Sequence, residues 1–400
     1  MQLKELRQSF AVTYDYSVYF ADGVFTPDNP LLRDVLSRAG ECPHRLMIVL
    51  DSGVAEHHPR LGDQIQAYCE HHADAIALSG EPLIVKGGEV CKLAPLEVQQ
   101  FYDKVAEEAI CRHSFVLVIG GGAVLDAMGF AAATAHRGVK LIRMPSTVLA
   151  QNDAGVGVKN AINHGQRKNF VGTFAPPYAV INDVQLLSTL DPRDQRAGIS
   201  EAVKVALVKD AEFFQYLYRS RHALGQFQPI AMQHMIQRCA ELHLAHIANN
   251  GDPFEQGSAR PLDFGHWAAH KLEELTHAAV RHGEAVAIGV MLDSLYSWRL
   301  GQLSDNDIAA IYATLTDMGF AVYHYEMAAM DVAGALEEFR AHLGGELCIT
   351  LLDDIGVGRE YATIDTDLMQ ACVDDLARLH AGEAQSVFAS SAQLELSLAV

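Results

Sequence analysis

Long apolar runs, paired cysteines and an excess of positive charge are all missing from this sequence. No stretch approaches the roughly 20 consecutive apolar residues of a membrane span. The first residues, MQLKELRQSFAVTYDYSVYF, alternate polar and apolar side chains like a strand and lack the apolar core of a signal peptide. The seven cysteines are widely spread and never form a CxxC pair, which is typical of reduced, mostly packed thiols. We therefore expect a soluble cytoplasmic protein without a membrane segment.

Positive charge is scarce, because 30 Lys and Arg residues stand against 50 Asp and Glu residues, a formal net charge of -20. Nucleic-acid affinity depends on phosphate neutralisation by Lys and Arg, so the composition argues against a nucleic-acid partner. A small anionic substrate is still compatible with it if basic residues gather locally. The 400 residues exceed what one hydrophobic core usually serves, and half of them are hydrophobic, so we expect two globular domains.

The first half of the chain alternates strand-like runs with helical patterns. The strand-like runs cover residues 45–51, 75–79, 82–86 and 115–119, and the helical patterns cover residues 59–74 and 95–112. This alternation predicts βα units on a parallel sheet. Ligands of such sheets bind beyond the carboxyl ends of the strands. The candidates at these ends are Asp51 and the triplet Gly120–Gly122.

The glycine triplet follows a buried-looking strand and opens a helical pattern. Without side chains there, the backbone can approach a pyrophosphate that faces the helix N–H groups. The triplet is not the GxGxxG motif, and a tight turn without a ligand is the alternative interpretation. A polar, glycine-rich connection follows within residues 140–183, and its candidates for binding hydroxyls and a phosphate are Asp153, Lys159, Lys168 and Asn169. A solvated loop is the alternative reading of this connection.

Strand signals mostly cease near residue 183, where helical patterns take over. We therefore divide the chain into an α/β domain, residues 1–183, and a helical domain, residues 184–400. In the helical part, Glu201 and Lys204 lie within one helix turn. Most such pairs are surface ion pairs worth roughly a few tenths of a kcal/mol. This helix is otherwise rich in Ala, Val and Leu, and a carboxylate in apolar surroundings needs a partner such as a cation.

The segment 260–284 contains four histidines. His266 and His270 are four residues apart and share one face of a helix, and His282 lies just before a second helical pattern. Two explanations stay open, a metal or anion site and a chance surface pair in a chain with 19 histidines. A zinc site that stays open to substrate needs three protein ligands, and Glu201 is the candidate for the third.

Several longer motifs follow one another along the chain: GGGAVLD, PSTVLAQND followed by GVK, KN, AGISEAVK, and FGHWAAH followed by RHGE. With these motifs the chain resembles the dehydroquinate synthase family, the sugar phosphate cyclases, over nearly its whole length. The resemblance implies an N-terminal Rossmann-like α/β domain and an all-α C-terminal domain. It also implies a lyase that depends on NAD and on zinc, with cobalt as the other metal considered.

The resemblance assigns roles residue by residue. It implies zinc ligation by Glu201, His266 and His282. The NAD contacts that it implies are Asp51, Glu89, Lys92, Gly121, Gly122, Asp126, Ser146, Thr147, Lys168 and Thr189. The catalytic and substrate-binding positions that it implies are Asp153, Lys159, Asn169, Lys204, Asp263, His270 and Arg137. Arg137 matches an arginine that reaches the phosphate site of the neighbouring subunit, which implies a homodimer.

The reaction implied by the resemblance begins with transient oxidation of a substrate hydroxyl by NAD and continues with β-elimination of phosphate, return of the hydride, ring opening and an intramolecular aldol addition. Dehydroquinate synthases have an arginine, an asparagine and a lysine where this chain has Ala259, Asp263 and Ala245. Loss of one charged partner of a buried carboxylate costs on the order of 1.5–3 kcal/mol. We therefore expect sedoheptulose 7-phosphate, which lacks that carboxylate, and a likeness to the 2-epi-valiolone synthase branch. A one-residue shift would let Arg260 replace the missing arginine.

Three other functions stay open. The nearest alternative is a 3-dehydroquinate synthase that acts on 3-deoxy-arabino-heptulosonate 7-phosphate. A second is a metal-dependent oxidoreductase like glycerol dehydrogenase, which resembles the same architecture but has Asp where this chain has Glu201 and lacks the KN motif and Lys159. The third is a non-catalytic binding protein on the same fold, against which the presence of all three presumed zinc ligands argues.

Overall fold

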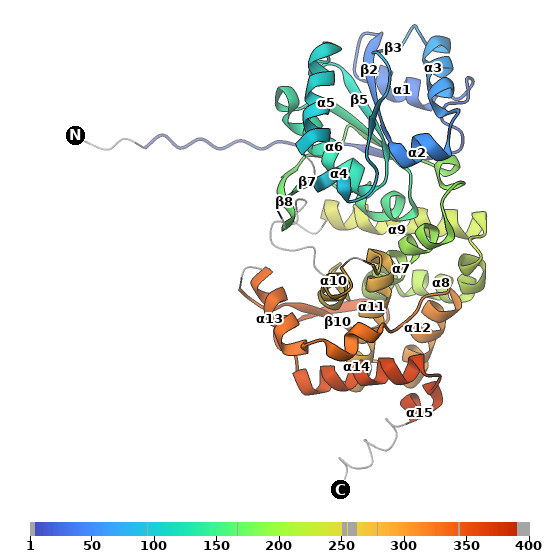
Figure 1. Ribbon diagram of the computed structural model, residues 1–400, viewed down its shortest axis with the longest axis vertical. Helices are drawn as coiled ribbons and strands as arrows, with labels where there is room; N and C mark the ends of the chain where they lie inside the picture. The colour runs from blue at the N-terminus through green and yellow to red at the C-terminus, as the bar shows by residue number, and fades with distance from the viewer. Residues whose placement is uncertain are drawn as a thin grey trace. The chain divides into compact units, whose positions relative to one another are not determined.

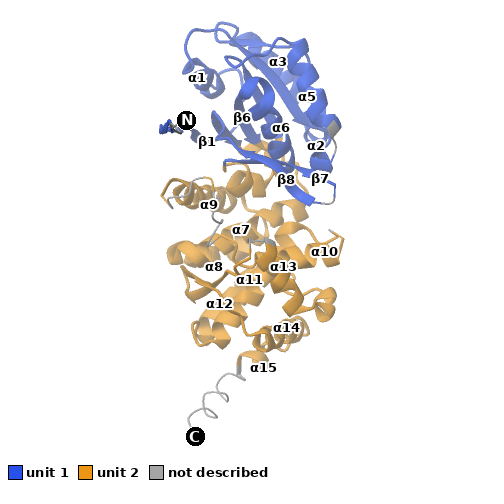
Figure 2. Cartoon of the chain, turned by 90° about the vertical axis from the view of Figure 1, so that its left-hand side faces the viewer, with its two compact units in different colours: residues 1–119, 123–144, 158–182 blue, residues 120–122, 145–157, 183–400 orange. Residues whose placement is uncertain are grey.

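The computed structural model describes residues 5–93, 95–165, 167–249, 254, 262–277, 279–342 and 345–389 (Figure 1). The chain divides into two compact units, which Figure 2 shows in separate colours. Unit 1 comprises Met1–Ile119, Ala123–Met144 and Val158–Asn182, and unit 2 comprises Gly120–Gly122, Pro145–Gly157 and Asp183–Val400. Two short segments of the N-terminal half thus belong to the unit that contains the C-terminal half.

A seven-stranded sheet forms the centre of unit 1. Its strands are β1 (Ser17–Ala21), β2 (His44–Asp51), β3 (Ile76–Leu78), β4 (Leu83–Val85), β5 (Phe115–Gly120), β6 (Lys140–Pro145) and β9 (Ala179–Asp183). The order is β1-β9-β6-β5-β2-β3, with β4 also paired to β2, and β2 is parallel to β3, β4 and β5. β5 is buried at every position, as expected for a central strand of a parallel sheet that is covered on both faces.

The helices of unit 1 connect these strands. They are α1 (Leu31–Ser37), α2 (Ser52–His57), α3 (Leu61–His71), α4 (Val90–Leu93), α5 (Pro95–Glu107) and α6 (Gly122–Thr134). The polar connection after β6 is more ordered than a solvated loop. It contains a π-helical turn, η2 (Ala150–Ala154), and an antiparallel hairpin of β7 (Lys159–His164) and β8 (Arg167–Phe174). β8 is mostly exposed and β7 is mostly half-buried, so the hairpin lacks the buried apolar face that makes a strand recognisable in a sequence.

Among its described residues, unit 2 is helical apart from one hairpin. Its helices are α7 (Pro192–Lys209), α8 (Ala211–Gly225), α9 (Pro229–Asn249), α10 (His266–Leu275), α11 (His282–Arg299), α12 (Asp305–Asp317), α13 (Val332–His342), α14 (Thr366–His380) and α15 (Ala384–Ala389), and the hairpin joins β10 (Ile349–Asp354) to β11 (Val357–Tyr361). α11 lies at the centre, buried from Ala285 to Trp298 and packed against α7, α10, α12, α14 and β10. A helix that is apolar all round is stable only inside a core.

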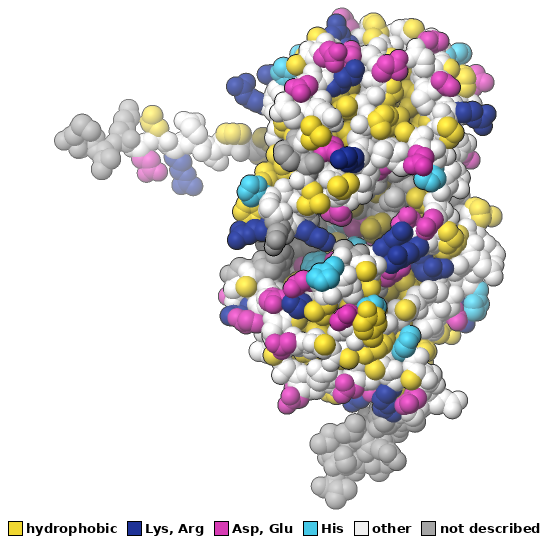
Figure 3. Space-filling model, in the orientation of Figure 1, with side chains coloured by type: hydrophobic (Ala, Val, Ile, Leu, Met, Phe, Trp, Pro, Cys, Tyr) yellow, Lys and Arg dark blue, Asp and Glu magenta, His cyan; other side chains and the backbone are white. Residues whose placement is uncertain are grey.

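The predicted fold class, a parallel α/β domain followed by a helical domain, is confirmed. None of the helices in the described part of the chain is long and apolar enough to cross a membrane. On the face drawn in Figure 3, acidic and basic side chains are interspersed over both units.

Candidate metal and cofactor site

Helix α7 begins at an aspartate cap and carries two charged side chains on its buried face. Asp191 accepts hydrogen bonds from the backbone N–H groups of Arg193 (2.7 Å) and Asp194 (3.1 Å), which are donors that a helix start leaves without partners. Further along, Glu201 and Lys204 are only 1% and 4% exposed and form an ion pair. A pair buried to this extent is unlike the exposed pairs of a helix surface.

One oxygen of Glu201 lies beside two imidazoles. His266 is the first residue of α10, and His282 is the first residue of α11. Their Nε2 atoms lie 3.7 Å and 3.6 Å from Oε1 of Glu201. Among the described residues this buried oxygen has no hydrogen-bond donor. A buried acceptor without a donor, placed between two imidazole nitrogens, is satisfied by a bound cation.

The three groups fit a metal ion. One ligand atom from each of Glu201, His266 and His282 lies within 4.8 Å of the others, and the ligands of a tetrahedral zinc ion are about 3.4 Å apart. Burial and the charge of Lys204 lower the pKa of His266 to about 3, so this imidazole is neutral. Burial acts to raise the pKa of Glu201, but Lys204 and the two histidines outweigh it and hold the pKa well below its usual range. Two imidazole nitrogens and a carboxylate suit zinc or cobalt.

His282 has a carboxylate on each side of its ring. Nδ1 lies 3.5 Å from Oε2 of Glu273, and Nε2 faces Glu201. Burial acts to lower the pKa of His282, but these two carboxylates raise it to about 10. A metal that binds Nε2 therefore has to displace a proton there, while Glu273 stays available to orient the ring as carboxylates commonly do for histidine ligands.

The turn before His266 is held by Asp293, a fully buried side chain of α11. Its Oδ2 accepts a hydrogen bond from the backbone N–H of Gly265, and its Oδ1 accepts one from Nε1 of Trp267, both at 2.9 Å. Gly289 of α11 packs so closely on this turn that a Cβ there would lie 1.9 Å from the carbonyl oxygen of Gly265. α11 thus fixes the point from which α10 and His266 start.

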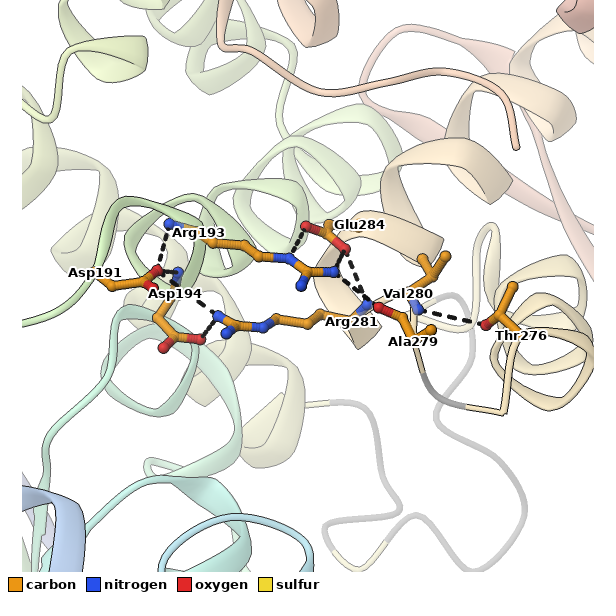
Figure 4. A network of polar contacts seen from close by, with 8 residues as sticks. All are labelled: Asp191, Arg193, Asp194, Thr276, Ala279, Val280, Arg281 and Glu284. Carbon is orange, nitrogen blue, oxygen red and sulfur yellow. Dashed lines mark hydrogen bonds and ion pairs between the residues drawn. The ribbon is translucent and has the colours of Figure 1, made fainter. Parts of the chain in front are cut away.

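A second set of contacts ties the start of α11 to the start of α7 (Figure 4). Arg193 donates to both carboxylate oxygens of Glu284 (2.5 and 2.6 Å) and to the carbonyl oxygen of Ala279 (2.9 Å). Glu284 also accepts a hydrogen bond from the backbone N–H of Arg281 (2.9 Å), whose side chain pairs with Asp194. The two helices that carry Glu201 and His282 are therefore joined directly at their N-termini. We call these four charged residues, Arg193, Asp194, Arg281 and Glu284, the interhelix clamp.

Other predicted residues of unit 2 surround the same cluster. Burial acts to lower the pKa of Lys204, but the charges of Glu201, Asp153 and Asp263 outweigh it and raise the pKa. Asp153, in η2, lies 2.9 Å from Nδ1 of His243 on α9. His270 is exposed, and its ring centroid lies 5.6 Å from that of His266. Residues far apart in the sequence thus lie around the three candidate metal ligands.

A separate polar cluster occupies unit 1. Nζ of Lys92 lies 2.6 Å from Oδ2 of Asp126 and 2.8 Å from Oδ1 of Asn169. Burial raises the pKa of Asp126, although Lys92 opposes the shift. Asp51 caps α2 by accepting a hydrogen bond from Gly53 (2.8 Å). The cluster combines one cation with carboxylate and amide acceptors, groups able to bind the hydroxyls and phosphates of a nucleotide.

The remaining predicted positions differ in exposure. Glu89, Arg137, Lys159, Lys168 and Thr189 are exposed, Gly121, Gly122 and Thr147 are half-buried, and Ser146 is buried. Three positions bear on the choice of substrate. Asp263 is half-buried, Ala245 is exposed on α9, and Ala259 lies outside the described residues. Arg260 also lies outside them.

The sequence reasoning missed three residues that position the others. Glu273 lies seven residues after His266, so helical spacing places it on the same face and could have identified it. Asp293 lies in the apolar run GVMLDSLY, where a lone carboxylate signals a buried partner. His243 has no comparable signal, because only the packing of η2 on α9 brings it to Asp153.

Comparison with known proteins adds two matches to protein families. The 3-dehydroquinate synthase N-terminal family matches residues 82–197, and the 3-dehydroquinate synthase C-terminal family matches residues 198–340. The 3-dehydroquinate synthases of Shewanella pealeana and Shewanella halifaxensis are each 30% identical to this chain, over 366 and 363 residues, and each alignment covers 90% of this chain and 96% of the relative.

Among solved structures, 2-epi-5-epi-valiolone synthase from Streptomyces hygroscopicus subsp. jinggangensis 5008, with NAD+ and Zn2+ bound, has a TM-score of 0.81 and is 28% identical, covering 93% of this chain and 99% of that one. Glycerol dehydrogenase from Schizosaccharomyces pombe has a TM-score of 0.60 at 12% identity, covering 94% of this chain and 91% of that one. The second likeness concerns the fold alone.

Proposed function

Because the chain belongs to the 3-dehydroquinate synthase family of sugar phosphate cyclases, we propose that it converts sedoheptulose 7-phosphate to a cyclitol with release of phosphate. The product would be of the 2-epi-valiolone type, and the enzyme would be a homodimeric lyase that depends on NAD and on zinc or cobalt. The valiolone synthase structure, which has NAD+ and Zn2+ bound, supports this choice of cofactors.

The observation that carries the choice of substrate is the charge around Lys204. Asp263 lies three residues before His266, and its backbone carbonyl oxygen accepts a hydrogen bond from the His266 backbone N–H at 2.9 Å. The cluster already contains the carboxylates of Glu201 and Asp153, and its buried cation, Lys204, is paired with Glu201. A substrate carboxylate there would meet negative charge, whereas a hydroxymethyl group would not.

The chain's own residues have separable tasks in this reaction. When bound, the metal and NAD supply Lewis acidity and a transient hydride acceptor. Glu201, His266 and His282 would hold the metal, and Asp51, Lys92 and Asp126 would contribute to the NAD site. His270, Lys159, Asn169 and the partner's Arg137 would bind the phosphate that leaves, whose own oxygens are able to accept the proton of the elimination step.

Incubation of the purified protein with each heptulose phosphate tests the proposal. We expect inorganic phosphate to be released from sedoheptulose 7-phosphate and not from 3-deoxy-arabino-heptulosonate 7-phosphate. Release from the 3-deoxy acid alone would overturn the substrate assignment. The double variant Ala259→Arg, Asp263→Asn should improve use of the carboxylated substrate, and Asp263→Asn alone serves as its control.

A 3-dehydroquinate synthase is the second candidate, favoured by the two relatives of that name at 30% identity. The same phosphate-release experiment separates it from the leading proposal. An oxidoreductase of the glycerol dehydrogenase type would instead show net reduction of NAD by a simple alcohol, whereas a cyclase regenerates its NAD within each turnover.

A further inference from the structure

Arg143 is a charged residue in the middle of a buried strand. It lies in β6, where every position after Lys140 is buried, and its own side chain is 0% exposed. Burial of a guanidinium group costs free energy unless a counter-charge lies near it and its N–H groups are hydrogen-bonded. The contacts of Arg143 therefore indicate why a charge is placed inside this sheet.

The side chain of Arg143 holds the base of the β7–β8 hairpin (Figure 2). Its Nη2 atom donates to Oδ1 of Asn160 at 2.6 Å and to the backbone carbonyl oxygen of Lys159 at 3.1 Å. The side-chain amide of Asn160 donates in turn to the carbonyl oxygens of Val158 (3.3 Å) and Ala175 (3.1 Å). These two residues lie just before β7 and just after β8, so the arginine is joined to both ends of the hairpin.

Helix α6 packs against the same contact. A Cβ at Gly129 would lie 2.0 Å from Oδ1 of Asn160 and 3.4 Å from Nη2 of Arg143, so this glycine leaves the space that the hydrogen bond occupies. Burial lowers the pKa of Arg143, while the charge of Asp126, also on α6, opposes the shift. The hydrogen bond between β6 and the hairpin is therefore enclosed within unit 1, with a counter-charge nearby.

The anchored residue determines where its neighbour points. Side chains alternate between the two faces of a strand. Asn160 is turned inward and is only 2% exposed, and the adjacent Lys159 is exposed. A shift of the strand by one residue would bury the lysine and expose the asparagine. The bond from Arg143 to Asn160 thus fixes the face of the hairpin from which Lys159 extends.

A separate set of contacts holds the hairpin farther along β8. Asn169 has a left-handed backbone, with φ 52°, a conformation that asparagine adopts more readily than most residues. Its backbone N–H donates to Oδ1 of Asn163 at 2.8 Å, and its side-chain oxygen accepts a hydrogen bond from Nζ of Lys92, also at 2.8 Å. Loss of Arg143 should therefore displace Lys159 more than Asn169.

We propose that Arg143 is a positioning residue for Lys159. By holding Asn160 and the carbonyl group of Lys159, it keeps the ammonium group of the lysine where that group binds the phosphate of the substrate. A lysine on a fixed strand loses less conformational freedom on binding than one on a loose segment. The proposal depends on the phosphate-binding role of Lys159 in the proposed function, and Arg143 acts through β7 without touching the substrate.

Calorimetric titration of the full-length protein with inorganic phosphate tests this role. We expect Arg143→Met and Lys159→Met each to raise the dissociation constant roughly tenfold, as loss of one hydrogen bond between charged groups would. In the Lys159→Met background, Arg143→Met should add no further change, because the arginine acts through the lysine. A merely structural role of Arg143 would instead add its effect in the double variant.

Arg45→Met is the matched control. Arg45 lies near the start of β2 and also donates to backbone carbonyl oxygens, those of Glu108 and Ala109, both at 3.2 Å. Its loss should leave the affinity for phosphate unchanged. A tenfold loss in this variant as well would mean that general destabilisation of unit 1 weakens binding, and it would overturn the proposal.

Asn160→Ala provides a second variant that leaves the arginine in place. It removes the acceptor that Arg143 holds, so it should weaken phosphate binding by a similar factor. A single cooperative unfolding transition and an unchanged metal content check the fold of each variant. If Lys159→Met weakens binding but neither Arg143→Met nor Asn160→Ala does, the positioning role is wrong and the role of Lys159 stands. If Lys159→Met itself binds phosphate like the wild type, both roles are wrong.

Discussion

At the scale of single residues, the least replaceable group is the carboxylate of Glu201. Its Oε1 is buried, lacks a hydrogen-bond donor among the described residues, and lies within 3.7 Å of two imidazole nitrogens. Glu201→Gln keeps the shape but removes the charge that a divalent ion requires. We expect the purified variant to contain almost no metal by elemental analysis, while its affinity for NAD is preserved.

Lys204→Met is the matched control for that measurement. It removes the buried cation but leaves all three donors, so the variant should retain metal and lose cyclase activity. Equal metal contents in wild type and Glu201→Gln would show that the ion binds elsewhere.

A second single-residue prediction concerns Asp293. Burial raises the pKa of this carboxyl to about 7, although its bonds from Trp267 and Gly265 favour the charged form. Because the folded pKa lies above the unfolded value of about 4, the contribution of this group to stability is complete below about pH 4 and is lost as the pH rises through about 7. The wild type should therefore lose on the order of 2 kcal/mol relative to Asp293→Asn between pH 5 and pH 8. Denaturant unfolding in the presence of a chelator measures it, and parallel curves for the two proteins would contradict it.

At the scale of helices, the interhelix clamp sets the distance between two metal ligands. Arg193 bonds Glu284 through two nitrogens, but at 44% exposure it contributes to stability no more than about 1 kcal/mol. Its effect on the metal site should be larger, because groups that orient ligands commonly change affinity about 10-fold or more. We expect Arg193→Gln to weaken zinc binding roughly 10-fold in a competition titration.

Arg221→Gln is the control for the clamp, because Arg221 joins α8 to α12 through Asp317 by a comparable bond of 2.7 Å. It should leave zinc affinity unchanged. A similar loss in both variants would mean that general destabilisation, rather than the clamp, affects the site.

Some helices and strands of this protein could be predicted from the sequence, and others could not. The strands β2 and β5 and the helical C-terminal half follow from hydrophobic periodicity, which the structure confirms. The starts of helices α10 and α11, at His266 and His282, could be predicted because each follows a break in a helical pattern. The β7–β8 hairpin could not, because β8 is mostly exposed and neither strand has a periodic row of buried apolar side chains. The partners of Asp293 lie 26 and 28 residues away, and spacing along one helix says nothing about such contacts.

The substrate-related positions illustrate a further limit. Ala259 and Asp263 differ from the pattern of dehydroquinate synthases, but a difference in residue type alone does not show where the side chains lie. The structure adds that Asp263 shares the electrostatic surroundings of Lys204. The assignment of sedoheptulose 7-phosphate, the roles of the site residues and the homodimer stay predictions.

At the scale of the whole molecule, the two units have separate cores and can be observed separately. Both tryptophans of the chain, Trp267 and Trp298, lie in unit 2 and are 2% and 5% exposed. Trp267 follows His266 directly and donates to Asp293. Intrinsic tryptophan fluorescence therefore reports unfolding of the unit that contains the three metal donors, whereas far-ultraviolet circular dichroism reports both units.

Removal of the metal should therefore destabilise unit 2 selectively. A ligand at 100 times its dissociation constant stabilises the folded state by about 2.7 kcal/mol, which corresponds to a shift of roughly 5–10 °C for a unit of this size. We expect a chelator to lower the fluorescence-detected midpoint by about this amount and added zinc to restore it. In Glu201→Gln neither addition should move the midpoint. If zinc shifts the midpoint of that variant as much as that of the wild type, the stabilising ion is not held by Glu201, His266 and His282.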